Sequence, residues 1–269
     1  MKIDQKTFER VASSATNGSN AVFEKIEPQF EIVERQLKNE LLGSMADKMD
    51  SVPNLSAVVT RLICLRAYYE QVPQLDLILT PTGFGIVSNQ NLAPASADRV
   101  KSLRTRLKQA YDDDFDRAIE MLVGTDWADT PQARMVIPHL IYTAKIFRQY
   151  VDKPNAHRSD LESVNSKIYV AEEKLREYLS SEFFDSLLEK LRMDVLTKAE
   201  LHVVHTCCQF IGFCVTAQYI PAKQLLDRIV DNIDKNADSF EIYKNSPAYR
   251  IKHQERYQNE KEDSTYFWG

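Results

Sequence analysis

Residues 79–96 read Leu-Thr-Pro-Thr-Gly-Phe-Gly-Ile-Val-Ser-Asn-Gln-Asn-Leu-Ala-Pro-Ala-Ser, and they hold two of the seven glycines and two of the ten prolines of the chain. Before them, apolar and polar residues alternate as in a short strand. Pro81-Thr82-Gly83 has the composition of a tight turn, because proline fixes φ and glycine tolerates positive φ. Phe84, Ile86 and Val87 predict a second strand, and Pro94 then begins a long helix. We therefore expect a β-hairpin at about residues 75–88, inserted into a helical protein.

The same stretch, together with Asp98-Arg99-Val100 after it, resembles a segment of uncharacterised proteins from Bacteroides-type phages and prophages. Those proteins are similar to head–tail connector (adaptor) subunits, which are helical and assemble as rings under the portal. The resemblance is specific over this stretch and loose over the rest of the chain. It implies a non-enzymatic structural protein of the virion, assembled in the bacterial host cytoplasm. Its partners would be other copies in a homo-oligomeric ring, and the portal and tail or neighbouring ring proteins.

The composition is that of an ordinary globular protein. The 269 residues are 43% hydrophobic and 27% charged, which is enough apolar material for a sizeable core. The net charge of −5 does not favour non-specific binding to nucleic acid or to an anionic membrane. The first ten residues lack the apolar segment of a signal peptide, and the apolar stretch at 210–217 is too short to span a bilayer. Four cysteines in apolar surroundings predict reduced thiols.

The periodicity of apolar residues predicts an all-α multi-helix bundle with the one inserted hairpin. Ile26, Phe30, Val33, Leu37 and Leu41 form one helical stripe, and a second stripe runs from Leu161 to Leu179. We expect four parts in the chain: a flexible N-terminal arm (1–20), a first helical unit that contains the hairpin (21–150), a second helical unit (155–238) and an extended aromatic-rich C-terminal tail (239–269).

The two helical units resemble each other in sequence. Residues 30–41 align without gaps with residues 168–179, and in both places an apolar helix follows after a polar break. A tandem duplication of a small helical unit would explain the match. Two unrelated amphipathic helices would also align in this way. Superposable helix sets would favour duplication, whereas a different connectivity of the halves would argue against it.

The C-terminal tail carries seven aromatic residues between positions 240 and 269. Aromatic side chains bury large areas and are frequent anchors of interfaces. We expect the tail to dock on a neighbouring subunit; docking on its own domain is the alternative. The expected interaction residues are those of the hairpin tip and of the tail, namely Thr80, Pro81, Thr82, Gly83, Phe84, Gly85, Tyr257, Tyr266, Phe267 and Trp268.

Three groups of residues resemble parts of known binding or metal sites, but the sequence favours a structural role for each group. Gly83-Phe84-Gly85 lacks the spacing and the lysine of a phosphate-binding loop. His202, His205, Cys207 and Cys208 resemble part of a zinc site, but their apolar helix favours buried side chains without metal. Asp112-Asp113-Asp114 and Asp116 predict a solvated helix face. With no nucleophile motif either, we expect no catalytic residue, no cofactor and no metal; an enzyme of unknown reaction is the least favoured class.

Basic residues cluster on the helix that follows the hairpin: Arg99, Lys101, Arg104, Arg106 and Lys108. They could face DNA passing transiently through the lumen of a ring. They could also pair with acidic groups of a neighbouring subunit, which we favour because opposite charges set the register of subunit contacts. A helical adaptor or regulatory module that binds a single protein partner is the alternative function.

Overall fold

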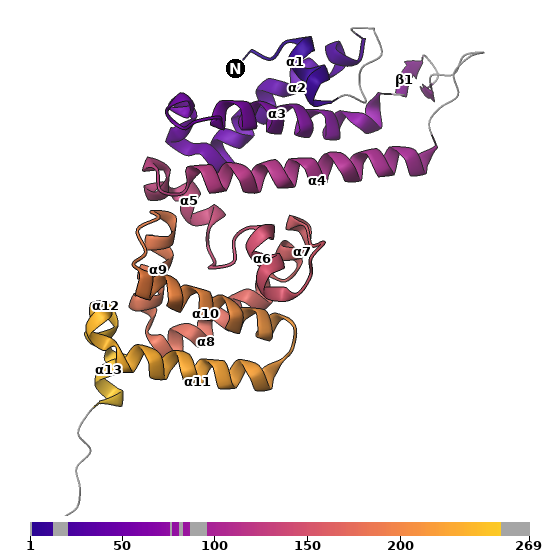
Figure 1. The fold of residues 1–269 in the computed structure, drawn as a ribbon. Coiled ribbons are helices and arrows are strands. Elements are labelled where there is room, and N and C mark those ends of the chain that lie inside the picture. Colours follow the sequence, from indigo (N-terminus) through magenta and orange to yellow (C-terminus); the bar gives the residue numbers. More distant parts are fainter. Residues whose placement is uncertain (1, 13–20, 76, 81–82, 87–95, 254–269) are drawn as a thin grey trace, which may run out of the picture.

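The computed structural model describes residues 2–12, 21–75, 77–80, 83–86 and 96–253, and this part of the chain is predominantly helical (Figure 1). The predicted all-α class is confirmed. Short turns of π- and 3₁₀-helix connect α2 to α3. The helices are α1 (Gln5–Val11), α2 (Ala21–Leu37), α3 (Leu55–Gln71), α4 (Ala97–Leu122), α5 (Pro131–Val136), α6 (Ala144–Val151), α7 (Arg158–Ser163), α8 (Asn165–Leu179), α9 (Ser181–Arg192), α10 (Lys198–Val215), α11 (Tyr219–Lys235), α12 (Glu241–Lys244) and α13 (Pro247–Lys252).

Two hydrophobic cores organise these helices. The first includes buried residues from Ile3 to Ile137, and the second includes buried residues from Leu140 to Tyr243. Figure 1 shows the helices of the first core in indigo to magenta, and below them those of the second in rose, orange and yellow. The change from one core to the other falls at Pro138. Residues 140–151, expected in the first unit, therefore belong to the second core.

The local signals for helix ends act as the sequence predicts. The Thr130 hydroxyl accepts a hydrogen bond from the Ala133 backbone N–H at the start of α5, and Pro131 occupies the first turn. Pro138 separates α5 from α6, because proline lacks the N–H that a continuing helix requires. Gly124 follows α4 with a φ of +76°, a left-handed conformation that glycine adopts at little cost. The helix expected from Leu161 is interrupted at Val164, where α7 ends and α8 begins.

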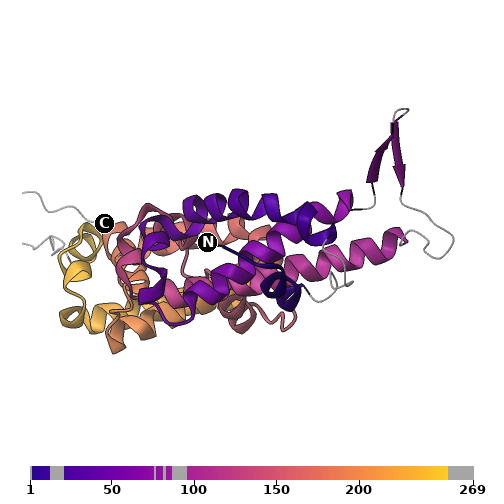
Figure 2. The ribbon, with the colours of Figure 1, turned by 90° about the horizontal axis from the view of Figure 1, so that it is seen from above.

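Two short strands lie between α3 and α4. β1 (Leu77–Thr80) and β2 (Gly83–Ile86) pair in antiparallel register, with Leu77 opposite Ile86 and Thr80 opposite Gly83. Figure 2 shows the pair standing clear of the helices, to one side of the N-terminal end of α4. Pro81 and Thr82, expected at the tip, lie outside the described residues.

The N-terminal segment, expected as a flexible arm, contains helix α1. Asp4 caps this helix by accepting a hydrogen bond from the Thr7 backbone N–H at 2.8 Å. Phe8 is 1% exposed, with ring centroids at 5.8–6.0 Å from three aromatic rings, those of Phe23, Phe30 and Tyr68. The arm prediction is thus wrong for residues 5–11, because one buried phenylalanine anchors them to the first core. Residues 13–20 lie outside the described part.

The first half of the expected C-terminal tail also folds back on its own molecule. Phe240 and Tyr243 are buried in the second core, where both rings contact Phe183 at centroid distances of 5.5 and 5.8 Å. The Tyr243 hydroxyl donates to an Asp234 carboxylate oxygen at 2.6 Å. Residues 240–253 are therefore helices α12 and α13 and are not an extended tail. Residues 254–269, with Tyr257, Tyr266, Phe267 and Trp268, lie outside the described part.

The two cores share an order of three main helices. α3 packs between α2 and α4, and α10 packs between α8 and α11. The aligned segments 30–41 and 168–179 lie in α2 with its π-helical extension (Lys38–Leu42) and in α8, respectively. Between the first two of these helices, the second core has helix α9, whereas the first core has short 3₁₀ turns. The duplication therefore stays a prediction.

Candidate functional site

The acidic run on α4 was expected on a solvated face, and the structure places most of it in the interior. Asp112, Asp114 and Asp116 are 5%, 6% and 8% exposed, whereas Asp113 faces solvent. Lys108 Nζ lies 2.7 Å from Asp112 Oδ2, and Arg61 Nε donates to Asp114 Oδ2 at 2.9 Å. The prediction is wrong because other helices cover α4 on more than one side. Each of these three carboxylates therefore pairs with a basic residue, on a neighbouring turn of α4 or on another helix.

Asp116 joins the two cores. Its Oδ2 accepts the Ala144 backbone N–H at 2.7 Å, which satisfies a free donor at the start of α6, and its Oδ1 accepts a bond from Arg158 of α7. The Arg158 guanidinium also lies over the Phe115 ring, 4.7 Å from the centroid. Burial raises the pKa of Asp116, while Arg158 acts in the opposite direction. This arrangement is a structural junction, because every one of these groups already has a partner within the molecule.

The cysteines and the histidines of α10 differ in their exposure to solvent. Cys207 and Cys208 are buried, as predicted, and burial raises the pKa of both thiols. His202 and His205 are exposed, so the expectation that they are buried is wrong, and His205 contacts the Tyr150 hydroxyl. Among the described residues, no three His, Cys, Asp or Glu side chains are placed to hold one metal ion.

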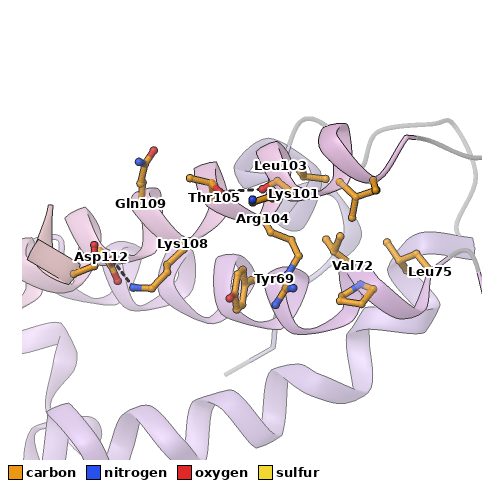
Figure 3. Close-up of a pocket in the computed structure, with 14 residues that line it drawn as sticks. Tyr69, Val72, Leu75, Lys101, Leu103, Arg104, Thr105, Lys108, Gln109 and Asp112 are labelled. Atoms are coloured by element: carbon orange, nitrogen blue, oxygen red, sulfur yellow. Dashed lines mark hydrogen bonds and ion pairs between the residues drawn. The ribbon is translucent and has the colours of Figure 1, made fainter. Parts of the chain in front are cut away.

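A groove of about 820 Å³ runs between the C-terminal end of α3 and the N-terminal half of α4 (Figure 3). We call it the α3–α4 groove. One part of it is apolar and the other is charged. The apolar lining consists of Val72, Pro73, Leu75, Ala97, Val100 and Leu103, and the charged lining of Lys101, Arg104, Lys108 and Asp112.

The predicted basic patch divides between two faces of α4. Successive residues of an α-helix are rotated by about 100°, so Lys101, Arg104 and Lys108 fall within about 60° of one another. These three line the α3–α4 groove. Arg99 and Arg106 lie on the opposite side of the helix, away from the groove, and both are exposed. The patch is thus not one surface, and three of its five members form a candidate site.

Tyr69 of α3 holds the central cation of the groove in place. The Arg104 guanidinium lies over the Tyr69 ring, 4.6 Å from its centroid, and Figure 3 shows the two side chains side by side. Arg104 Nε is buried and has no hydrogen-bond partner in the described part of the chain. Lys108 reaches Asp112, whereas Lys101 and Arg104 form no ion pair among the described residues. The groove therefore offers unused cationic donors beside an apolar surface, which suits a ligand that is both acidic and apolar.

A smaller hollow of about 260 Å³ continues from the charged end of the groove, with Arg66 and Tyr111 in its lining. Arg66 is already engaged, because its guanidinium donates to Glu40 at 2.8 Å and to Glu70 at 3.2 Å. Burial raises the pKa of the Tyr111 hydroxyl, against the opposing effect of Arg66. These groups are satisfied internally, so the available cations are those of the groove itself.

The sequence analysis missed the α3 side of the groove. The sequence predicts an apolar helix that ends at about Val72 and so contains Tyr69, and it places Leu75 at the start of the hairpin; neither prediction indicates a groove. The spacing of Lys101, Arg104 and Lys108, three and four residues apart, was the available signal for a single basic stripe. Which apolar residues face that stripe depends on how α3 packs on α4, and no local pattern encodes this.

Comparison with known proteins found a match to one family profile. The profile described as "Family of unknown function (DUF6712)" matches residues 18–136, a stretch that ends beside Ile137, the last buried residue of the first core. The match thus covers the strands, α4 and the α3–α4 groove. No curated protein and no solved structure matches the chain. Within the described residues, no helix is both long and apolar enough to cross a membrane.

Proposed function

We propose that this protein is a non-enzymatic structural subunit of a phage or prophage virion, a head–tail connector (adaptor) ring subunit that joins portal and tail. The observation that carries the proposal is the position of the β1–β2 pair, which stands clear of the helical body (Figure 2). The resemblance of the hairpin segment to connector-like phage proteins is the second support.

The physical argument concerns the stability of an isolated pair of strands. Two strands alone are at best marginally stable in water. In the described part of the chain, β1 pairs with β2 and the sheet has no third strand, so each strand presents one open edge. Open edges pair readily with a strand of another chain, which gives directional joining of subunits. A protein that exposes such a pair at one end is suited to contact a neighbouring ring or subunit.

The mass of the purified full-length chain tests this proposal. A ring has a mass that is a fixed multiple of 31.0 kDa, measurable by light scattering coupled to size exclusion and visible by negative-stain electron microscopy. Replacing residues 77–86 by a short Gly-Ser linker should reduce assembly and leave the helical circular dichroism unchanged. A protein that stays at 31.0 kDa at every concentration, with closed rings never seen, would contradict the proposal.

The α3–α4 groove favours the second candidate, a helical adaptor that binds one protein partner. A groove with apolar and cationic lining fits an acidic amphipathic segment. The same mass measurement separates the two functions, because the adaptor is a monomer that forms a complex of defined stoichiometry with its partner.

A further inference from the structure

We infer that the α3–α4 groove receives the acidic, aromatic C-terminal segment, residues 254–269, of a second copy of this chain. The inference rests on the proposed function, because it supplies the contact by which subunits of an oligomer hold one another. It deepens that function by naming which surface of one subunit binds which segment of the next.

Charge complementarity is the first argument. Three basic side chains line the groove, and its one acid, Asp112, is already paired with Lys108. Lys101 and Arg104 have no ion-pair partner in the described part of the chain, and the buried Arg104 Nε has no acceptor. Residues 254–269 read Gln-Glu-Arg-Tyr-Gln-Asn-Glu-Lys-Glu-Asp-Ser-Thr-Tyr-Phe-Trp-Gly, with four acids against two bases. The segment therefore brings the carboxylates that the groove lacks.

The order of chemical groups is the second argument. Along α4, the groove runs from Arg104 through Lys101 to Ala97, seven residues or about 10 Å of helix, with the apolar Val100 and Leu103 beside the two cations. In the segment, acids at 260, 262 and 263 precede aromatic residues at 266–268. The four residues from Asp263 to Phe267 span about 13 Å when extended. Carboxylates at Arg104 and Lys101 and aromatic rings against the neighbouring apolar lining are thus compatible with one extended peptide.

The position of the chain end indicates that the segment comes from another copy. Helix α13, which ends at Lys252, lies at the opposite end of the molecule from the N-terminal end of α4, in both Figure 1 and Figure 2. A chain's own segment would have to pass along the second unit to reach the groove, and ordering it over that path costs conformational entropy. A neighbouring copy placed head to tail presents the segment directly, and such heterologous contacts close into rings when the rotation allows.

Charge reversal in the full-length chain tests the inference. The groove variant carries Lys101→Glu and Arg104→Glu, and the segment variant carries Glu260→Lys, Glu262→Lys and Asp263→Lys. The matched control is Arg99→Glu with Arg106→Glu, which makes the same change of net charge as the groove variant on the opposite face of the same helix. Sedimentation velocity measures self-association, and circular dichroism confirms that each variant is folded.

We expect the groove and segment variants each to weaken self-association by about tenfold or more, because like charges replace opposite ones, and the control to change it by less than about threefold. Mixing the groove variant with the segment variant should restore association. In that mixture the acidic segment of one variant meets the basic groove of the other, and the basic segment meets the acidic groove. Restoration by mixing requires contact between copies, and a segment bound within its own chain cannot produce it.

Four results would overturn the inference. The control could weaken association as much as the groove variant does, or the segment variant could assemble like the wild type. Mixing could fail to restore association although both variants are folded. The groove variant could instead lose affinity for duplex DNA with its assembly unchanged, which would assign the groove to nucleic acid. In each of these cases the wild type still assembles and the proposed function stands, whereas a wild type that is always monomeric overturns both.

Discussion

Gly212→Ala is the substitution for which sequence and structure predict opposite effects. Gly212 lies in α10, where glycine costs about 1 kcal/mol relative to alanine, so the sequence predicts a gain in stability. In the folded chain α10 passes directly against the end of α6. A Cβ at Gly212 would overlap the Tyr150 carbonyl oxygen and lie 3.0 Å from its carbonyl carbon. The obstacle is backbone, which cannot rotate away as a side chain can.

The expected magnitude follows from these contacts. Restoring an ordinary separation from the Tyr150 carbonyl oxygen requires α6 and α10 to move apart by about 1.5 Å, because heavy atoms pack best at about 3.5–4.0 Å. Phe147 of α6 and Ile211 of α10 are fully buried in the same core and lose contacts when the helices separate. Overpacking costs about 1–3 kcal/mol, and the upper end applies to a backbone obstacle. After subtracting the helix-propensity gain, the free energy of unfolding should fall by about 2 kcal/mol.

Urea unfolding followed by circular dichroism at 222 nm measures this change. With a slope of about 3 kcal/mol per molar urea, the midpoint should fall by about 0.7 M. Gln209→Ala is the control, since Gln209 is exposed on the same helix and its replacement should change stability by less than about 0.5 kcal/mol. A Gly212→Ala protein that is as stable as the wild type, or more so, would refute the packing of α6 on α10.

Three further predictions concern buried polar and thiol groups. Asp116→Asn should lower the free energy of unfolding by about 2 kcal/mol, because it weakens the cap of α6 and leaves the half-buried Arg158 guanidinium with only the exposed Glu162 as its counter-charge. The exposed Asp113→Asn should change it by less than about 0.5 kcal/mol, and denaturant unfolding of both variants compares them. Burial raises the pKa of the Cys64 thiol to about 12, so only about 1 in 10⁴ of these thiols is ionised at pH 8. Its reaction with a disulfide reagent, followed by mass mapping, should therefore be far slower in the folded chain than in urea. Equal rates would contradict the burial of Cys64. Burial acts to raise the pKa of Glu200, but Lys190 and the Thr197 cap outweigh it and lower the pKa below the ordinary 4.5. The stabilisation from this carboxylate is therefore present above pH 4.5 and lost as the pH falls through the lower folded value, so that acid should reduce the stability of the wild type more than that of Glu200→Gln between pH 5 and pH 3.

The acidic run on α4 illustrates a limit of sequence patterns. Asp112 and Asp116 lie four residues apart and share one side of the helix, whereas Asp114 between them lies on the other side. From the sequence they predict exposure, since carboxylates are seldom buried without partners. Their partners are Lys108, one turn away, and arginines from α3 and α7. Tertiary packing brings those arginines to α4, and no pattern within the run indicates it.

The sequence by itself determined the helical class and several helix ends, because periodicity, caps, prolines and glycines act through neighbours a few residues away. Thr130, Pro138 and Gly124 each have the predicted local effect. Tertiary structure alone decided where one core ends and the next begins, which faces of α4 are covered, and that the basic stripe lies opposite Tyr69 and an apolar wall. These features depend on contacts between residues far apart in the chain, whose free energies are set by the packing of whole helices.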